Sequence, residues 1–237
     1  MASRNSARDF SQLPLSFKLV EDITLDNFIV GDNDEIHYML SHFIGSDLYQ
    51  SLYLWGVSGS GKSHLLQAVC QLAAEKELMS SYLPLSESIA VPDWLDGMET
   101  FDLVCLDDLH KVAGNKEWEQ ALFHFYNRLK DAGGQLLMSA DQAPQGLGVQ
   151  LPDLLSRLSW SAVYKLNELD DEGKLQVMKD RSCVKGIPLT DEVASFILKR
   201  VGRDLEQILT TLEQLDHESL VRKRKITIPF VREIMGW

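Results

Sequence analysis

Apolar runs and amphipathic stretches alternate along the chain between residues 46 and 166. Short runs rich in leucine, valine, tyrosine and tryptophan predict strands at 50–56, 78–84, 101–107, 134–140 and 160–166. The spacing of apolar positions between them predicts helices at 62–75, 86–96 and 116–131, with a shorter helix at 152–158. This alternation is typical of an α/β fold, in which helices cover both faces of a parallel sheet.

The strand pattern stops near residue 167, and the rest of the chain predicts helices at 168–185, 190–201, 203–220 and 227–236. Thr190 suits the start of one helix, and Pro229 suits the first turn of the last one. We therefore expect three parts: an N-terminal segment at 1–18, mobile and polar over residues 1–11, an α/β domain at 19–166 and an all-helical domain at 167–237.

Composition narrows the class of protein. The formal net charge of −12 over 237 residues disfavours broad, non-specific binding to nucleic acid, which needs an electropositive surface. The three cysteines lie far apart without metal-ligand spacing, as expected for free thiols in a reducing cytosol. No segment has the pattern of a signal peptide or a membrane span, so we expect a cytoplasmic protein.

The most specific motif is Gly56-Val57-Ser58-Gly59-Ser60-Gly61-Lys62-Ser63, a complete GxxxxGK[ST] sequence between a predicted strand and a predicted helix. Glycines in such a loop let backbone amides face phosphate oxygens, and the start of the following helix adds a positive dipole. Lys62 is expected to reach the β/γ-phosphates, and the Ser63 hydroxyl to bind Mg²⁺. The sequence therefore predicts binding of a nucleoside triphosphate or diphosphate.

The predicted strand at 101–107 ends in Asp107-Asp108. In P-loop enzymes a strand of this kind lies beside the loop, and Asp107 fits the metal-side position while Asp108 fits the place of an acid that polarises water. The alternative is a pair of turn or cap residues. The next strand ends in Ser139-Ala140-Asp141, where Ser139 or Asp141 could sense the terminal phosphate or simply cap the strand.

With these segments the chain resembles the AAA+ ATPases, and among them the branch of the bacterial replication initiator DnaA. The resemblance covers residues 19 to 237 through its adenine segment (Phe28-Ile29-Val30-Gly31), Walker A loop (56–63), Walker B strand (103–108), sensor 1 (138–144), arginine-finger segment (154–160) and sensor 2 (202–206). It implies a P-loop core with a five-stranded parallel sheet, followed by a small helical lid. It also implies that ADP or ATP with Mg²⁺ contacts Phe28, Val30, Gly56, Ser58, Gly59, Ser60, Gly61, Lys62, Ser63, His64 and Arg203.

The resemblance also assigns two arginines. Arg157 would reach into the nucleotide site of a neighbouring subunit, where an arginine supplied in trans stabilises the transferred phosphoryl group, and Arg203 would contact the chain's own nucleotide. Asp108 stands where many efficient ATPases have glutamate, and because aspartate is one methylene shorter, we expect slow intrinsic hydrolysis. AAA+ interfaces also imply possible homo-oligomers.

Near the N-terminus, Gln12-Leu13-Pro14-Leu15-Ser16-Phe17 resembles the short motif with which bacterial proteins bind the DNA polymerase sliding clamp. In this interpretation Gln12 hydrogen-bonds at a pocket rim, and Leu15 and Phe17 fill an apolar cleft. Leu13 is a further clamp-binding residue of the same motif. The alternative is that the apolar side chains pack on the domain itself.

Too few residues follow the expected lid for the helix-turn-helix domain of DnaA. The resemblance therefore implies a clamp-bound, nucleotide-bound regulator that stimulates hydrolysis of the ATP held by DnaA and so prevents renewed initiation of DNA replication. The alternatives are an ATPase motor or loader with its own turnover, and a DNA-binding adaptor. Only the basic run 222–225 supports DNA binding, and such a run is usually a solvated helix end, so we expect weak DNA contact at most.

Overall fold

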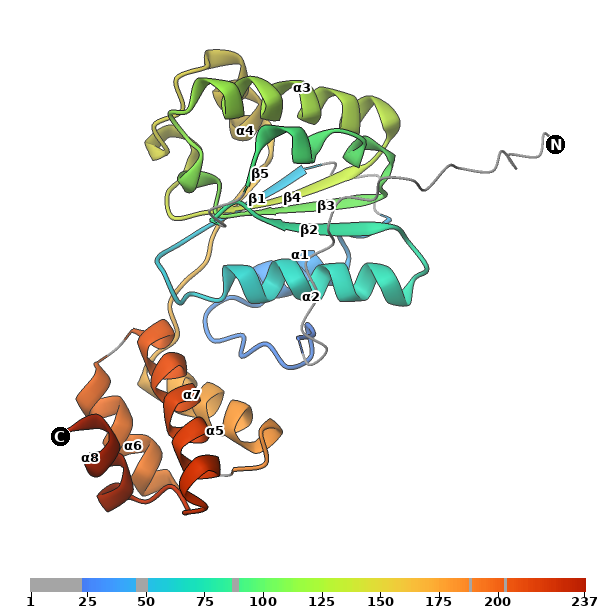
Figure 1. The fold of residues 1–237 in the computed structure, drawn as a ribbon. Coiled ribbons are helices and arrows are strands. Elements are labelled where there is room, and N and C mark those ends of the chain that lie inside the picture. The colour runs from blue at the N-terminus through green and yellow to red at the C-terminus, as the bar shows by residue number, and fades with distance from the viewer. Residues whose placement is uncertain (1–22, 46–50, 87–89, 188, 203) are drawn as a thin grey trace.

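The computed structural model describes residues 23–45, 51–86, 90–187, 189–202 and 204–237. The predicted tail, the clamp motif at 12–17 and Arg203 lie outside the described residues. Figure 1 shows a sheet covered on both sides by helices, with a second group of helices beyond one end of it. The five-stranded parallel sheet and the helical lid confirm the expected fold.

The strands are β1 (Ser51–Trp55), β2 (Ser80–Pro84), β3 (Leu103–Asp107), β4 (Gln135–Ala140) and β5 (Ala162–Lys165), in the spatial order β2-β3-β4-β1-β5. All five fall where the sequence predicts them. However, the strand that ends in Asp107 does not pair with the strand that leads into the phosphate loop. Strand β4 pairs with both and lies between them.

Helices α1 (Asp34–Ser41) and α2 (Lys62–Glu75) cover one face of the sheet, and α3 (Lys116–Ala132) and α4 (Pro152–Trp160) cover the other. Side chains of successive strand residues join different cores. Leu52 and Leu54 pack with the α1 and α2 side, whereas Tyr53 packs with the α3 and α4 side. Because both faces of the central strands β1, β3 and β4 are buried, these strands are apolar at most positions, which is why they could be recognised from the sequence.

The helix predicted at 86–96 is wrong over the described residues 90–96, which form only the short 3₁₀ helix Pro92–Leu95. Val91 precedes Pro92 and is extended, with φ −129° and ψ 149°, because the proline ring disfavours helical backbone at that position. Further 3₁₀ turns are Met98–Thr100, Leu109–Lys111 and Pro144–Gly146. Helix α1 was not predicted, although Ile36 and Leu40 have helical spacing and are buried.

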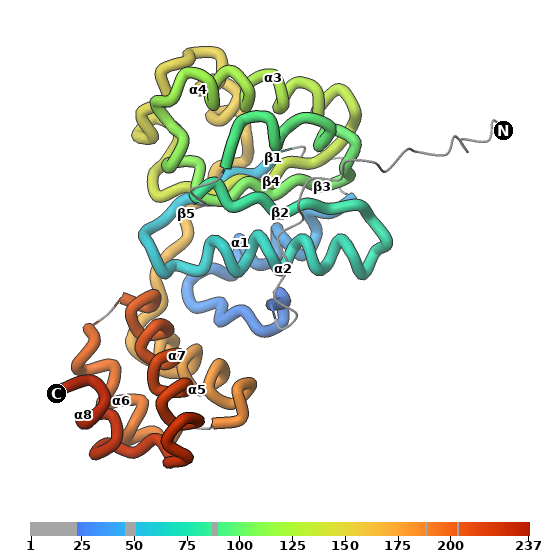
Figure 2. The backbone as a smooth tube through the Cα atoms, in the orientation of Figure 1, coloured from blue at the N-terminus to red at the C-terminus, as the bar shows by residue number. Residues whose placement is uncertain are grey.

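The lid contains α5 (Asp171–Val184), α6 (Asp191–Val201), α7 (Leu205–Arg222) and α8 (Ile228–Met235), which share one apolar core. The backbone trace in Figure 2 follows these helices away from the sheet to the C-terminus. Thr190 caps α6 as predicted, by accepting a hydrogen bond from the amide of Val193. Thr227 caps α8 in the same way, by accepting from the amide of Phe230, and Pro229 lies in the first turn as predicted. Among the described residues, no helix has both the length and the apolar character that a membrane span requires.

Candidate functional site

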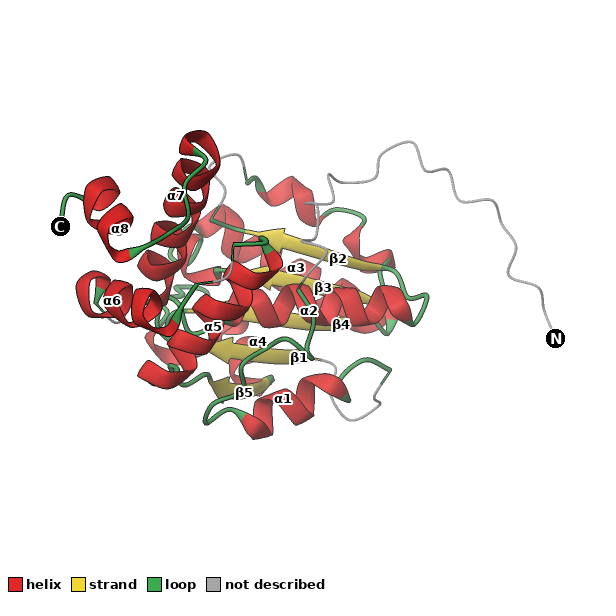
Figure 3. Cartoon of the chain, turned by 90° about the horizontal axis from the view of Figure 1, so that it is seen from below, coloured by secondary structure: helices red, strands yellow, loops and turns green. Residues whose placement is uncertain are grey.

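A cleft of about 770 Å³ lies where the carboxyl ends of the strands face the lid. Figure 3 shows the strand arrows pointing toward the lid helices, so the loops that follow the strands form one wall of the cleft. Residues 23–29 and helix α2 contribute further lining residues, and helices α5 and α7 close the cleft from the lid side. The strand ends and the lid thus enclose a site to which segments distant in sequence contribute.

The phosphate loop has the backbone geometry that its glycines predict. Gly59 and Gly61 have positive φ angles of 74° and 95°, which side-chain-bearing residues rarely adopt. A Cβ atom on Gly61 would also lie 2.8 Å from the Phe28 ring. Helix α2 starts immediately afterwards at Lys62, so its first amides point into the cleft. The loop therefore has the form of an anion cradle.

Lys62 supplies the positive charge at this point. Its ammonium donates hydrogen bonds to the carbonyls of Gly56 and Val57, each at 2.8 Å, and its side chain is buried. Burial lowers the pKa of Lys62, although the nearby carboxylates of Asp108, Asp107, Asp141 and Glu206 oppose this shift. The hydroxyl of Ser60 is buried beside it without a hydrogen-bond partner among the described residues. An ammonium and an unsatisfied donor in one cradle fit a polyphosphate.

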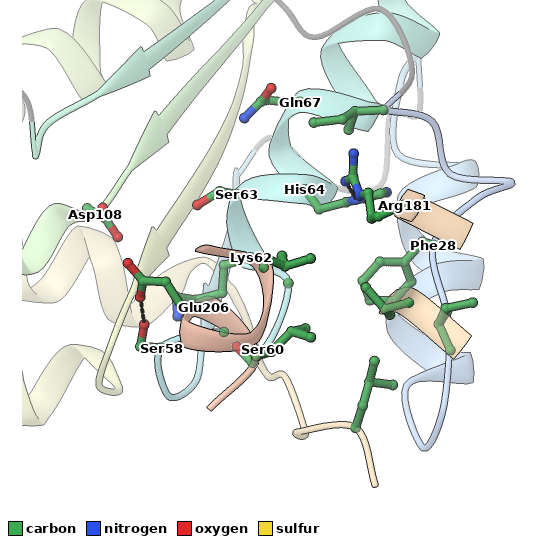
Figure 4. Close-up of a pocket in the computed structure, with 18 of the residues that line it drawn as sticks. Phe28, Ser58, Ser60, Lys62, Ser63, His64, Gln67, Asp108, Arg181 and Glu206 are labelled. Carbon is green, nitrogen blue, oxygen red and sulfur yellow. Dashed lines mark hydrogen bonds between the residues drawn. The ribbon is translucent and has the colours of Figure 1, made fainter. Parts of the chain in front are cut away.

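The other end of the cleft is aromatic and apolar, with the ring of Phe28 tilted against His64 at 5.5 Å between ring centres. Arg181 on α5 donates to Nδ1 of His64 at 3.3 Å, so Nε2 carries the proton and donates to the carbonyl of Thr24 at 3.0 Å. Burial lowers the pKa of His64, and the charge on Arg181 lowers it further. A neutral, fixed ring beside Phe28 suits a flat base (Figure 4).

The two Walker B acids occupy different environments. Asp107 is only 1 % exposed, and its carboxylate accepts hydrogen bonds from the Tyr82 hydroxyl at 2.7 Å and from the Ser139 hydroxyl. The Ser139 oxygen in turn accepts from the Asp108 amide at 3.0 Å. Asp107 and Ser139 are therefore under the floor of the cleft, whereas Asp108 lines it.

Asp108 and Asp141 face the cleft with His110 between them. Nδ1 of His110 lies 4.0 Å from the Asp108 carboxylate and 3.9 Å from that of Asp141. Burial, followed by the charge of Asp107, raises the pKa of Asp108, while His110, Ser86 and Lys62 oppose the shift. The acids at this end suit a metal ion or a water molecule near the terminal phosphate.

Most of the predicted nucleotide residues line this cleft together. They are Phe28, Ser58, Gly59, Ser60, Gly61, Lys62, Ser63, His64, Asp108 and Asp141. Val30 and Gly56 are not among the described residues that line the cleft. A Cβ atom on Gly56 would lie 2.6 Å from the Leu166 carbonyl, so this glycine allows the end of β1 to pack closely against the segment that connects β5 to the lid. Arg157 is also outside the lining, on α4, with its guanidinium 5.4 Å from the centre of the Trp160 ring.

Several lining residues were not predicted. The polar ones include Gln67, His110, Lys111, Arg181 and Glu206. Of these, His110 had a detectable signal, because it follows the Walker B acids by two residues. Glu206 lies in the segment 202–206 that resembles sensor 2, although only Arg203 was singled out there. Arg181 had no signal, since only the packing of the lid brings it to the cleft.

The described residues also fit a magnesium ion bound jointly with phosphates. They contain no group of three His, Cys, Asp or Glu side chains arranged for a metal. Magnesium in nucleotide sites typically takes only one or two protein ligands and completes its shell with phosphate and water oxygens. Ser63 and Asp108 both line the cleft and would suffice, while the metal role of Asp107 stays a prediction.

These features define a P-loop nucleotide-binding protein of the AAA+ type. Residues 19–165 match the model of the bacterial DnaA ATPase domain, and residues 171–235 match that of the Hda lid domain. The chain belongs to the bacterial DnaA ATPase family and has the lid of Hda, a DnaA homologue.

Solved structures share this fold. Domain III of DnaA from Thermotoga maritima superposes with a TM-score of 0.80 at 23 % identity, over 93 % of this chain and 98 % of that one. DnaA from Aquifex aeolicus bound to AMPPCP gives a TM-score of 0.68 at 24 % identity, over 86 % and 70 % of the two chains. A DnaA structure with AMPPCP and single-stranded DNA gives 0.68 at 25 %, over 86 % and 69 %.

Proposed function

We propose that the cleft binds an adenine nucleotide, ADP or ATP, with its base near Phe28 and Val30 and its phosphates on the loop from Gly56 to Ser63. Support comes from the DnaA structures that contain AMPPCP and from the buried Lys62 ammonium. Mg²⁺ would be held by Ser63 and by a Walker B acid, either Asp108 in the lining or the predicted Asp107 beneath it. Asp141 would lie near the terminal phosphate, Ser139 would support the acids from below, and Arg203 would be added from the lid.

We further propose that the chain is a regulator that stimulates hydrolysis of the ATP held by DnaA. Arg157 would complete the DnaA site in trans, and the motif with Gln12, Leu13, Leu15 and Phe17 would bind the sliding clamp. One observation supports the trans role. Arg157 is not among the described residues that line its own cleft, and it lies on α4 beside Trp160, which is 73 % exposed. An arginine placed there can serve a partner and not its own nucleotide.

The test is the turnover of DnaA-bound ATP, with and without the full chain, in the presence of DNA-loaded clamp and ADP. We expect a clamp-dependent acceleration that Arg157→Ala reduces by roughly 10³-fold or more, the effect typical of arginine fingers. Binding of ADP by the variant should be unchanged, since the side chain does not line its own cleft. Full stimulation by Arg157→Ala would show that another residue acts as the finger.

The same assay separates the alternatives. Substantial ATP turnover by the chain alone would favour a motor or loader. Leu15→Ala together with Phe17→Ala should abolish clamp dependence while leaving the melting temperature unchanged; a large loss of stability would favour packing of this segment on the domain. Arg222 and Arg224 both pair with Glu233 of α8, at 2.7 and 2.9 Å, which supports a structural role for the basic run.

Lys62→Ala provides the test of nucleotide binding itself. It removes the ammonium at the centre of the cradle, and we expect at least a hundredfold loss of ADP affinity by calorimetry. A folded variant, checked by its melting curve, that binds ADP as tightly as the parent chain would contradict the proposed site.

A further inference from the structure

Among the described residues, a charged side chain of the lid hydrogen-bonds to the phosphate loop. Glu206, at the second position of α7, accepts a hydrogen bond of 2.5 Å from the Ser58 hydroxyl, drawn as a dashed line in Figure 4. The contact joins residues 148 positions apart in the chain. It therefore depends on the packing of the lid against the loop.

The backbone around Glu206 is fixed. The Asp204 carboxylate accepts a hydrogen bond from the Glu206 amide at 2.9 Å and so caps α7. The start of α7 also packs against the loop, since a Cβ atom on Gly59 would lie 3.2 Å from Cβ of Leu205 and 3.3 Å from the Glu206 amide. The cap at Asp204 and the packing of α7 on Gly59 therefore hold Glu206 at the loop, in addition to its hydrogen bond with Ser58.

The carboxylate of Glu206 competes with a phosphate for the same groups. It occupies the Ser58 hydroxyl of the phosphate loop and acts electrostatically on the Lys62 ammonium. In loops of this type the lysine serves the β- and γ-phosphates, while backbone amides hold the α- and β-phosphates. Asp108 and Asp141 also line the cleft, and like Glu206 they act electrostatically on the Lys62 ammonium. The third phosphate of a triphosphate would therefore add negative charge close to three carboxylates, those of Glu206, Asp108 and Asp141.

We propose that Glu206 is a specificity-determining residue that disfavours nucleoside triphosphates relative to diphosphates. The inference rests on the proposed nucleotide binding and adds a residue that sets the length of phosphate chain accepted. A diphosphate can use the backbone cradle and Lys62 while the Glu206–Ser58 bond persists. A triphosphate must bring its terminal phosphate close to the Glu206 carboxylate or break that bond.

The experiment measures the dissociation constants of ADP and AMPPCP for the full chain by calorimetry, with Mg²⁺ present. For Glu206→Gln, which keeps the size of the side chain and removes its charge, we expect the AMPPCP affinity to rise relative to that of ADP by roughly 5- to 20-fold. Glu213→Gln is the matched control, because Glu213 is an exposed residue of the same helix and makes the same change in net charge. The control should leave the ratio unchanged.

Ser58→Ala separates charge from hydrogen bonding. If repulsion by the carboxylate sets the preference, Ser58→Ala keeps most of the discrimination, and Glu206→Gln removes it. An unchanged ratio in Glu206→Gln, or weaker binding of AMPPCP than in the parent chain, would overturn the inference, and the second result would indicate a metal-binding role for Glu206. If the parent chain binds neither nucleotide, the proposed nucleotide site itself fails, which is a distinguishable result.

Discussion

At the scale of the residue, Asp108 combines unusual backbone geometry with an unfavourable charge. Its φ and ψ angles of 62° and 46° are in the left-handed region, which aspartate and asparagine tolerate better than other side-chain-bearing residues. This conformation turns the chain directly after β3 and brings the carboxylate to the cleft, whereas that of Asp107 stays buried. Burial raises the pKa of Asp108, so the ionised form is disfavoured in the folded protein.

Asp108→Asn should therefore stabilise the chain at neutral pH. The raised pKa means that ionised Asp108 destabilises the fold above its folded pKa, and that this cost vanishes when the pH falls below the ordinary pKa of aspartate. We expect the melting temperature to rise by about 2 °C at pH 7 and to be unchanged near pH 3.5. Asparagine keeps the left-handed backbone. Asp26→Asn, at an exposed aspartate, is the control, and an equal gain at both pH values would contradict the argument.

At the scale of the element, the pairing of β3 with β4 assembles the floor of the cleft. Leu106 pairs with Met138, so Ser139 follows beside Asp107 and Asp108 and bonds to both. Ser139 is fully buried. The sequence alone does not distinguish whether Ser139 or Asp141 senses phosphate. The structure places Ser139 beneath the floor and Asp141 in the lining, which makes Asp141 the candidate for direct contact.

Ser139→Ala tests this pairing. It leaves the Asp108 amide without its acceptor and removes one donor to the Asp107 carboxylate, and we expect a loss of about 1–3 kcal/mol in the free energy of unfolding. Urea denaturation measures the loss. Ser156→Ala, at an exposed position of α4, should change stability by less than about 0.5 kcal/mol. Equal effects of the two substitutions would show that the serine bridge does not stabilise the floor.

At the scale of the whole molecule, the lid and the α/β domain meet at both ends of the cleft. Glu206 reaches the phosphate loop, and Arg181 reaches His64 at the start of α2. His64 in turn hydrogen-bonds to the carbonyl of Thr24, in the segment that precedes α1. Three separate parts of the chain are therefore linked around Phe28. A nucleotide in the cleft would contact all three and hold them in one arrangement.

Arg181→Gln should weaken ADP binding by roughly tenfold, because the ring of His64 loses the donor that fixes it beside Phe28. Fluorescence titration with a labelled ADP measures the effect, and the melting temperature without nucleotide should change little. Lys199→Gln, at an exposed cation of the lid, is the control. Unchanged affinity in Arg181→Gln, or the same loss in the control, would argue against a contribution of the lid at this end.

The sequence by itself determined the elements and the phosphate loop. Strands buried on both faces are apolar at most positions, glycines and Lys62 follow a fixed spacing, and threonine caps mark helix starts. All of these are local properties. The one helix that was predicted wrongly failed for a local reason as well, the effect of Pro92 on Val91.

Only the tertiary structure decided which strands are neighbours, which Walker B acid faces the cleft and which lid residues reach the loop. The position of β4 between β1 and β3 follows from the packing of both faces of the sheet, and no spacing in the sequence encodes it. Arg181 and Glu206 look like ordinary charged residues of surface helices until the lid packs against the loop. Contacts between residues more than a hundred positions apart are set by the shape of the packed domains, and those contacts complete this site.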